Sequence, residues 1–254
     1  MKDKSLLLSF VYLIMTALLL ATSVLAWFAI ADEVYTGDIF AGVSGGAVRE
    51  FRVRKNGINY DELYPTNAEV QANFPGLIVD RDEASYGYGY AIINNAQQMH
   101  NFFGDTVPGD QFEFLIDIIN FSAYELQARV NILQIESYIS GITGYDMRDV
   151  YYIVDGTYKV TKDVGGEKNV ITKTFTTNIN EADDETTFNH YRISNLIDEN
   201  KTLHIINTDD SDVNLVAPSE RLTIEFTIAY DVNATHNAYQ NGMFRFNAIY
   251  IYLV

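Results

Sequence analysis

Residues Arg221 to Asp231 read RLTIEFTIAYD and alternate apolar with polar side chains at a period of two. Successive side chains of a β-strand point to opposite faces, so this pattern is typical of a strand with one buried face. The face that we expect to be buried comprises Leu222, Ile224, Phe226, Ile228 and Tyr230.

Two segments earlier in the chain show the same alternation. They are QFEFLIDIIN at 111–120 and the segment 125–132, and the short connection NFSAY between them predicts two neighbouring strands. Further strands are predicted over 34–43, 48–54, 150–154, 157–161, 170–177 and 243–253. Turn signals separate them at Asp155-Gly156, Gly165-Gly166, Asn241-Gly242 and Pro108-Gly109.

Helical signals are scarce in this chain. Only 67–73 and 92–103 are predicted to form short helices, and no repeat or linker divides the body. Many short strands separated by turns indicate a sandwich or jelly roll. We therefore predict an all-β fold, in which a single antiparallel β-sandwich of jelly-roll type spans 27–254 and carries one or two short helices in insertions.

Composition limits the partners that the chain can have. The net charge of −17 over 254 residues argues against binding to nucleic acid or to an anionic membrane surface. The chain has no cysteine, which excludes disulfides, thiolate metal sites and a cysteine nucleophile.

The N-terminus has the pattern of an export signal. Lys2 and Lys4 precede a run without charged side chains that extends to Ala31. A small-x-small site predicts cleavage after Ala26, which would leave 1–26 as the signal peptide. The run is also long enough to cross a bilayer, so a membrane anchor retained to about residue 31 is the alternative. Both interpretations place the body outside the cytoplasmic membrane, at the cell surface or beyond. In both, the protein contacts the membrane only through this segment.

Several of these segments resemble a known family when they are taken in order. TSVLAWFAIADEV at 22–34 resembles the junction of proteins exported by a SipW-type signal peptidase. VPGDQFEFLIDIINFSAYELQARVNIL at 107–133 and YQNGMFRFNAIYI at 239–251 are similar to strands of the TasA and camelysin family. Residues 55–105 and 139–220 have no counterpart in the family.

The resemblance implies an extracellular structural subunit of a biofilm or cell-surface fibre. In such fibres the N-terminal segment of one subunit completes a sheet of the next by donor-strand exchange. The partners would be copies of the same chain, with a signal peptidase acting during export. The candidate donor strand is 27–36, with Trp27, Phe28, Ile30, Val34 and Tyr35 as its inserted side chains, and the alternative is that these residues complete the subunit's own sandwich.

No pattern of catalytic residues is present. His100, His190, His204 and His236 form no zinc-binding His-Glu-x-x-His motif, and no nucleophile elbow or phosphate-binding loop occurs. We therefore expect no enzymatic activity and no cofactor, with a secreted hydrolase as the least favoured class.

Calcium is the one ligand that the polar residues suggest. Asp210, Asp212 and Asn214 stand at alternate positions in TDDSDVN, like the start of a calcium loop, but the central Gly and closing Glu of an EF-hand are missing. A solvated turn is the alternative there. Tyr86, Tyr88 and Tyr90 of SYGYGY could form a sugar-stacking platform, or an aromatic loop packed on its own domain. The rival function is accordingly a membrane-tethered module that binds polysaccharide or calcium.

Overall fold

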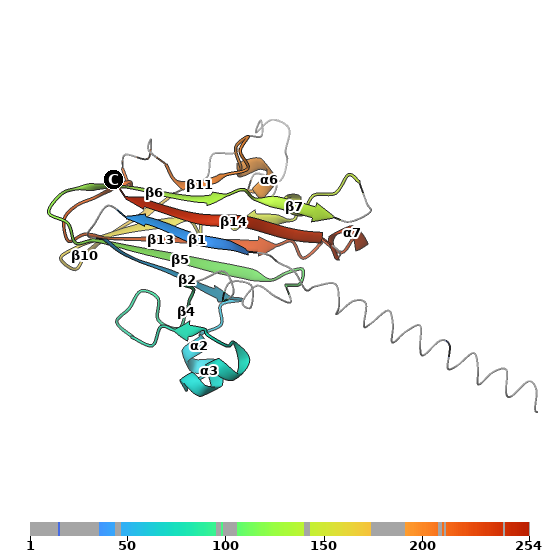
Figure 1. Ribbon diagram of the computed structural model, residues 1–254, viewed down its shortest axis with the longest axis horizontal. Helices are drawn as coiled ribbons and strands as arrows, with labels where there is room; N and C mark the ends of the chain where they lie inside the picture. The colour runs from blue at the N-terminus through green and yellow to red at the C-terminus, as the bar shows by residue number, and fades with distance from the viewer. Residues whose placement is uncertain are drawn as a thin grey trace, which may run out of the picture.

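A computed structural model describes residues 36–43, 47–94, 106–139, 143–173, 191–207, 212–240 and 242–253, together with Met15, Gln98 and Asp210. Two β-sheets lie face to face, and a helical insertion lies beside one of them (Figure 1). The predicted all-β fold with antiparallel sheets and few helices is confirmed. Of the N-terminal segment expected to be a signal peptide or anchor, only Met15 is among the described residues.

The six-stranded sheet has the order β1-β14-β6-β11, with β12 pairing β6 and β7 pairing β14. Its strands are β1 (Thr36–Val43), β6 (Leu126–Leu133), β7 (Glu136–Ile139), β11 (Leu203–Ile206), β12 (Leu215–Val216) and β14 (Gly242–Leu253). β1 is the outermost strand and runs parallel to β14, with Thr36 opposite Phe246 and Val43 opposite Leu253. The other pairs described in this sheet are antiparallel.

The eight-stranded sheet has the order β10-β9-β13-β5-β2-β4-β3, with β8 pairing β13. Its strands are β2 (Ala47–Lys55), β3 (Ile78–Val79), β4 (Ala91–Ile92), β5 (Gln111–Asn120), β8 (Tyr151–Ile153), β9 (Lys159–Val164), β10 (Glu167–Thr172) and β13 (Arg221–Tyr230). All the pairs described in it are antiparallel.

Apolar side chains from both sheets form one hydrophobic core. The ring of Phe114 stacks on that of Phe226 at 5.0 Å between centroids, and Phe51 lies 5.7 Å from Phe114. From the opposite sheet, Val130 and Ile249 are fully buried. Such aromatic pairs contribute about 0.5–1.5 kcal/mol beyond the area that they bury.

The two sheets differ in how their outward faces are covered. β6 alternates buried and half-buried residues, as its sequence predicts. In β5 and β13 the polar face is buried too, with Leu115, Asp117 and Thr223 at most 4% exposed. The sequence predicts one buried face for these strands, and that prediction is incomplete because the insertion between β2 and β5 covers the other face.

The insertion carries α2 (Tyr60–Leu63) and α3 (Asn67–Asn73), which lie below the sheet in Figure 1. The predicted helix 67–73 is confirmed, and its first turn is closed by a capping box between Thr66 and Glu69. The helix predicted over 92–103 is wrong at its start. Ile92 belongs to β4 and pairs with Arg52, because completing the sheet edge outweighs the helical spacing. Most of 93–103 lies outside the described residues.

The remaining helical elements are short and lie in connections. They are the 3-10 turn η1 (Met147–Asp149), α6 (Ile193–Leu196) and α7 (Asn237–Gln240). The described part of the chain thus has more helical pieces than the one or two expected. None of the helices in that part is long and apolar enough to cross a membrane.

The hairpin of β9 and β10 confirms the turn predicted at Gly165-Gly166. Both glycines have positive φ, 64° and 93°, as a two-residue type I′ turn requires. β10 ends at Thr172, before the predicted boundary at 177, and residues 174–177 lie outside the described residues.

Candidate functional site

The polar face of the eight-stranded sheet carries a buried charge network centred on Arg52. The Arg52 side chain is 6% exposed, with its Nε 3.1 Å from Asp80 Oδ2 and its Nη1 3.5 Å from Asp117 Oδ2. It also pairs with Glu50. Asp117 in turn lies 3.4 Å from Arg221 Nε. Three carboxylates and two guanidinium groups therefore share one site, with Arg52, Asp80 and Asp117 buried and with Glu50 and Arg221 partly exposed.

Burial raises the pKa of Asp117, and the nearby Arg221 and Arg52 oppose that shift. The hydroxyl of Thr223 also donates to Asp117 Oδ1 at 3.3 Å. Burying a charge without partners destabilises the fold, and these contacts offset that cost for the Asp117 carboxylate. Arg52, Asp80 and Asp117 at the centre of the network are buried, which suits a structural role better than ligand binding.

The SYGYGY segment lies over this network as a loop and not as a strand. Gly87 is in contact with Arg52: a Cβ atom at Gly87 would lie 2.2 Å from Arg52 Cδ. Gly89 has a φ of +77°, and a Cβ there would lie 2.1 Å from Asn59 Oδ1. The two glycines are thus the residues that allow the loop to approach the sheet and α2 so closely.

Each tyrosine of the loop donates its hydroxyl to a carboxylate of a different element. Tyr86 bonds to Asp163 of β9 at 3.1 Å, Tyr88 to Asp61 of α2 at 2.9 Å, and Tyr90 to Glu113 of β5 at 3.3 Å.

Two of the tyrosine rings also face cations. Lys168 lies 4.2 Å from the ring centre of Tyr86, and Arg54 lies 4.6 Å from that of Tyr90. Burial raises the pKa of both phenols, so both are neutral donors at physiological pH. Of the two interpretations of these tyrosines, the geometry is that of a loop packed on its own domain.

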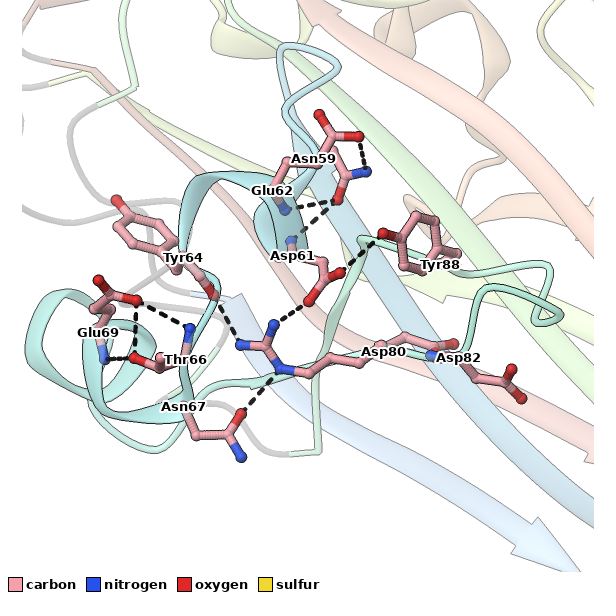
Figure 2. Close-up of polar contacts among 11 residues, drawn as sticks. Asn59, Asp61, Glu62, Tyr64, Thr66, Asn67, Glu69, Asp80, Asp82 and Tyr88 are labelled. Carbon is pink, nitrogen blue, oxygen red and sulfur yellow. Dashed lines mark hydrogen bonds and ion pairs between the residues drawn. The ribbon is translucent and has the colours of Figure 1, made fainter.

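Arg81 joins parts of the insertion by bonding to Asp61, Tyr64 and Asn67, which are labelled in Figure 2. Its guanidinium donates to the Tyr64 carbonyl at 2.8 Å and to Asn67 Oδ1 at 3.1 Å, and it also bonds to Asp61. Arg81 follows strand β3 and therefore joins that strand to α2 and to the start of α3. Asp61 is shared with Tyr88, which connects this hub to the tyrosine loop.

The predicted calcium residues lie together, but a lysine ammonium occupies the space between the carboxylates. Lys173 Nζ is 2.9 Å from Asp210 Oδ1 and 3.2 Å from Asp212 Oδ1. Burial acts to lower the pKa of Lys173, but the bonds to both aspartates outweigh it, and the pKa is raised. Asn214 is buried and donates to the carbonyl of Asn207 at 3.2 Å.

A calcium ion in this loop would have to displace Lys173 and bring oxygens to about 2.3–2.6 Å. The parts of the chain that the structure describes contain no cluster of three His, Asp or Glu arranged around a metal position. The calcium site therefore stays a prediction.

The two described histidines have different partners. The ring nitrogens of His204 lie 3.1 Å from Asp198 Oδ2 and 3.1 Å from Asn131 Oδ1. His236 stacks on Tyr145 at 4.4 Å and lies 3.1 Å from its hydroxyl. His100 and His190 lie outside the described residues, as do the cleavage residue Ala26 and the candidate donor side chains Trp27, Phe28, Ile30, Val34 and Tyr35.

Sequence reasoning missed Arg52 and Arg81. For Arg52 a signal was present, because charged residues alternate along β2 at Glu50, Arg52 and Arg54, and the acidic residues of β5, Glu113 and Asp117, share one face of that strand. For Arg81 there was none, since its partners lie 14 to 20 residues away with no periodic relation.

No protein-family model matches the chain, and no curated protein sequence matches it.

Proposed function

We propose that the chain is an exported structural subunit of a cell-surface or biofilm-matrix filament, without catalytic activity. Its subunits join by donor-strand exchange on a jelly-roll-like sandwich. The observation that carries the proposal is the position of β1. Among the described strands it is the outermost of its sheet, and the candidate donor strand, 27–36, continues into it at Thr36.

An outermost strand has one neighbour, so a chain that enters at a sheet edge can extend into another subunit without breaking an internal ladder. Only Thr36 of the candidate donor strand is described, and it pairs with Phe246 of the same chain. The exchanged segment therefore ends where β1 begins.

The groups that would bind polysaccharide or calcium in the rival function already have partners within the chain. The three tyrosine hydroxyls bond to carboxylates of the same chain, and the acidic loop holds Lys173. A polysaccharide or calcium ligand would have to compete with these contacts. A structural subunit needs no such ligand.

Mass spectrometry of the protein recovered from its host tests this proposal. A mature chain that begins at Trp27 and is found outside the cell, in fibres, supports it. A chain that begins at Met1 and fractionates with membranes as single subunits would reject it in favour of the tethered module.

A further inference from the structure

The outer edge of β10 has no neighbouring strand among the described residues. Among the described strands β10 pairs only with β9, in an unbroken register from Glu167 opposite Val164 to Thr172 opposite Lys159. Residues 167–170 are all exposed. The chain contains no bulge or proline here that would block a further strand.

The backbone groups that face outward can be assigned. The amide of Lys173 donates to the Tyr158 carbonyl at 2.9 Å, so odd-numbered residues of β10 bond to β9. The amides and carbonyls of Lys168, Val170 and Thr172 consequently point away from the sheet. Val170 is 55% exposed, which leaves an apolar side chain at the centre of this edge.

We propose that this edge pairs with the same edge of a second copy, antiparallel and centred on Val170. In that register Val170 faces its own counterpart and Lys168 faces Thr172, so no like charges meet. Glu167 comes opposite Lys173, so this pair also brings no like charges together. The edge is self-complementary, as a two-fold contact requires.

Charge also favours this place for self-association. The chain carries −17 overall, and like charge opposes contact between copies elsewhere. The hairpin segment 159–173 has four lysines against Asp163 and Glu167, so it does not share the acidic excess. The pairing joins two eight-stranded sheets and uses neither β1 nor the N-terminal segment, so it goes beyond the proposed donor-strand contact.

Cysteine cross-linking of the full chain tests the contact cleanly, because the native sequence has no cysteine. Val170→Cys places two thiols opposite each other across the two-fold axis, where Cα atoms about 5.5 Å apart permit a disulfide. Val164→Cys is the matched control, since Val164 is also 55% exposed but lies beside the turn. Under mild oxidation, V170C is expected to give mostly disulfide-linked dimers and V164C mostly monomers.

A second pair of variants tests the backbone contact. Lys168→Pro removes an outward amide that β9 does not use, so the fold is retained. K168P/V170C is expected to cross-link at least tenfold less than V170C. K168T/V170C, which keeps the amide, is expected to cross-link as much as V170C. Equal cross-linking at 164 and 170, no cross-linking at 170, or full cross-linking in the proline variant would each overturn the proposal. A proline variant that disrupts assembly while V170C fails to cross-link would show that a different strand, such as the N-terminal segment, occupies the edge.

Discussion

Gly87 lies so close to Arg52 that a Cβ atom on Gly87 would be 2.2 Å from Arg52 Cδ. The contact joins the tyrosine loop to the buried charge network of the eight-stranded sheet. A side chain at 87 must push the loop or the guanidinium away, and either movement disturbs the bonds of Asp80 and Asp117.

We expect Gly87→Ala to lower the free energy of unfolding by about 1–3 kcal/mol, the usual cost of overpacking. Urea unfolding followed by circular dichroism measures it. In a double-mutant cycle with Arg52→Ala, the two changes should couple by about 1 kcal/mol or more, since the clash disappears with the arginine side chain. Additive effects within about 0.5 kcal/mol would show that the contact is unimportant.

The Arg81 hub predicts a local loss of stability in the insertion. Arg81→Lys keeps the charge but cannot bond at once to Asp61, the Tyr64 carbonyl and Asn67. Amides of α2 and α3 should exchange hydrogen about tenfold faster in R81K, with those of β5 and β13 unchanged. Uniform acceleration across the chain, or none in the helices, would contradict the assignment of Arg81 as a local clamp.

Buried tyrosines predict a loss of stability at alkaline pH. Burial raises the pKa of Tyr60 to about 12, from about 10 when it is exposed. Below pH 10 the phenol is neutral in both the folded and the unfolded state, and the stabilisation is complete. Above pH 10 the unfolded state ionises while the folded state does not, so the stabilisation is lost as the pH rises through 12. Between pH 10 and 12 the free energy of unfolding should decrease by up to about 3 kcal/mol less in Tyr60→Phe than in the native chain. Chemical unfolding at a series of pH values tests this, and an unchanged slope in Y60F would refute it.

Lys173 predicts how the acidic loop responds to calcium. In the native chain its ammonium already lies between Asp210 and Asp212 and bonds to both, so we expect the same melting temperature with calcium as with a chelator. Lys173→Met frees both carboxylates, and calcium should then raise the melting temperature of the variant. A native chain whose melting temperature falls by several degrees on chelation would instead establish the predicted calcium site.

The sequence was most informative where one periodic pattern controlled the structure. β13, β5 and β14 lie within one residue of their predicted bounds, because alternating side chains specify a strand without knowledge of its partners. The Thr66 and Glu69 pair likewise marks α3 from local bonds alone. By contrast, β11 and β7 were not predicted, since four residues are too few to show a period.

The charge network was less predictable for a different reason. Its members come from β2, β5, β13 and the insertion, and only the antiparallel register brings Arg52, Asp117 and Arg221 together. The role of the tyrosine loop depends on the same packing. Spacing within SYGYGY suggests aligned rings, whereas the three hydroxyls reach three separate elements.

Electron microscopy of a mature chain that lacks residues 27–35 tests the central claim most directly. The deletion leaves β1 intact from Thr36, so the body should fold as before and show the same circular dichroism. The native mature chain, prepared in the same way, should form filaments, and the deletion variant should remain unassembled. Filaments of the deletion variant, or no filaments of the native chain, would contradict the claim that the N-terminal segment joins one subunit to the next.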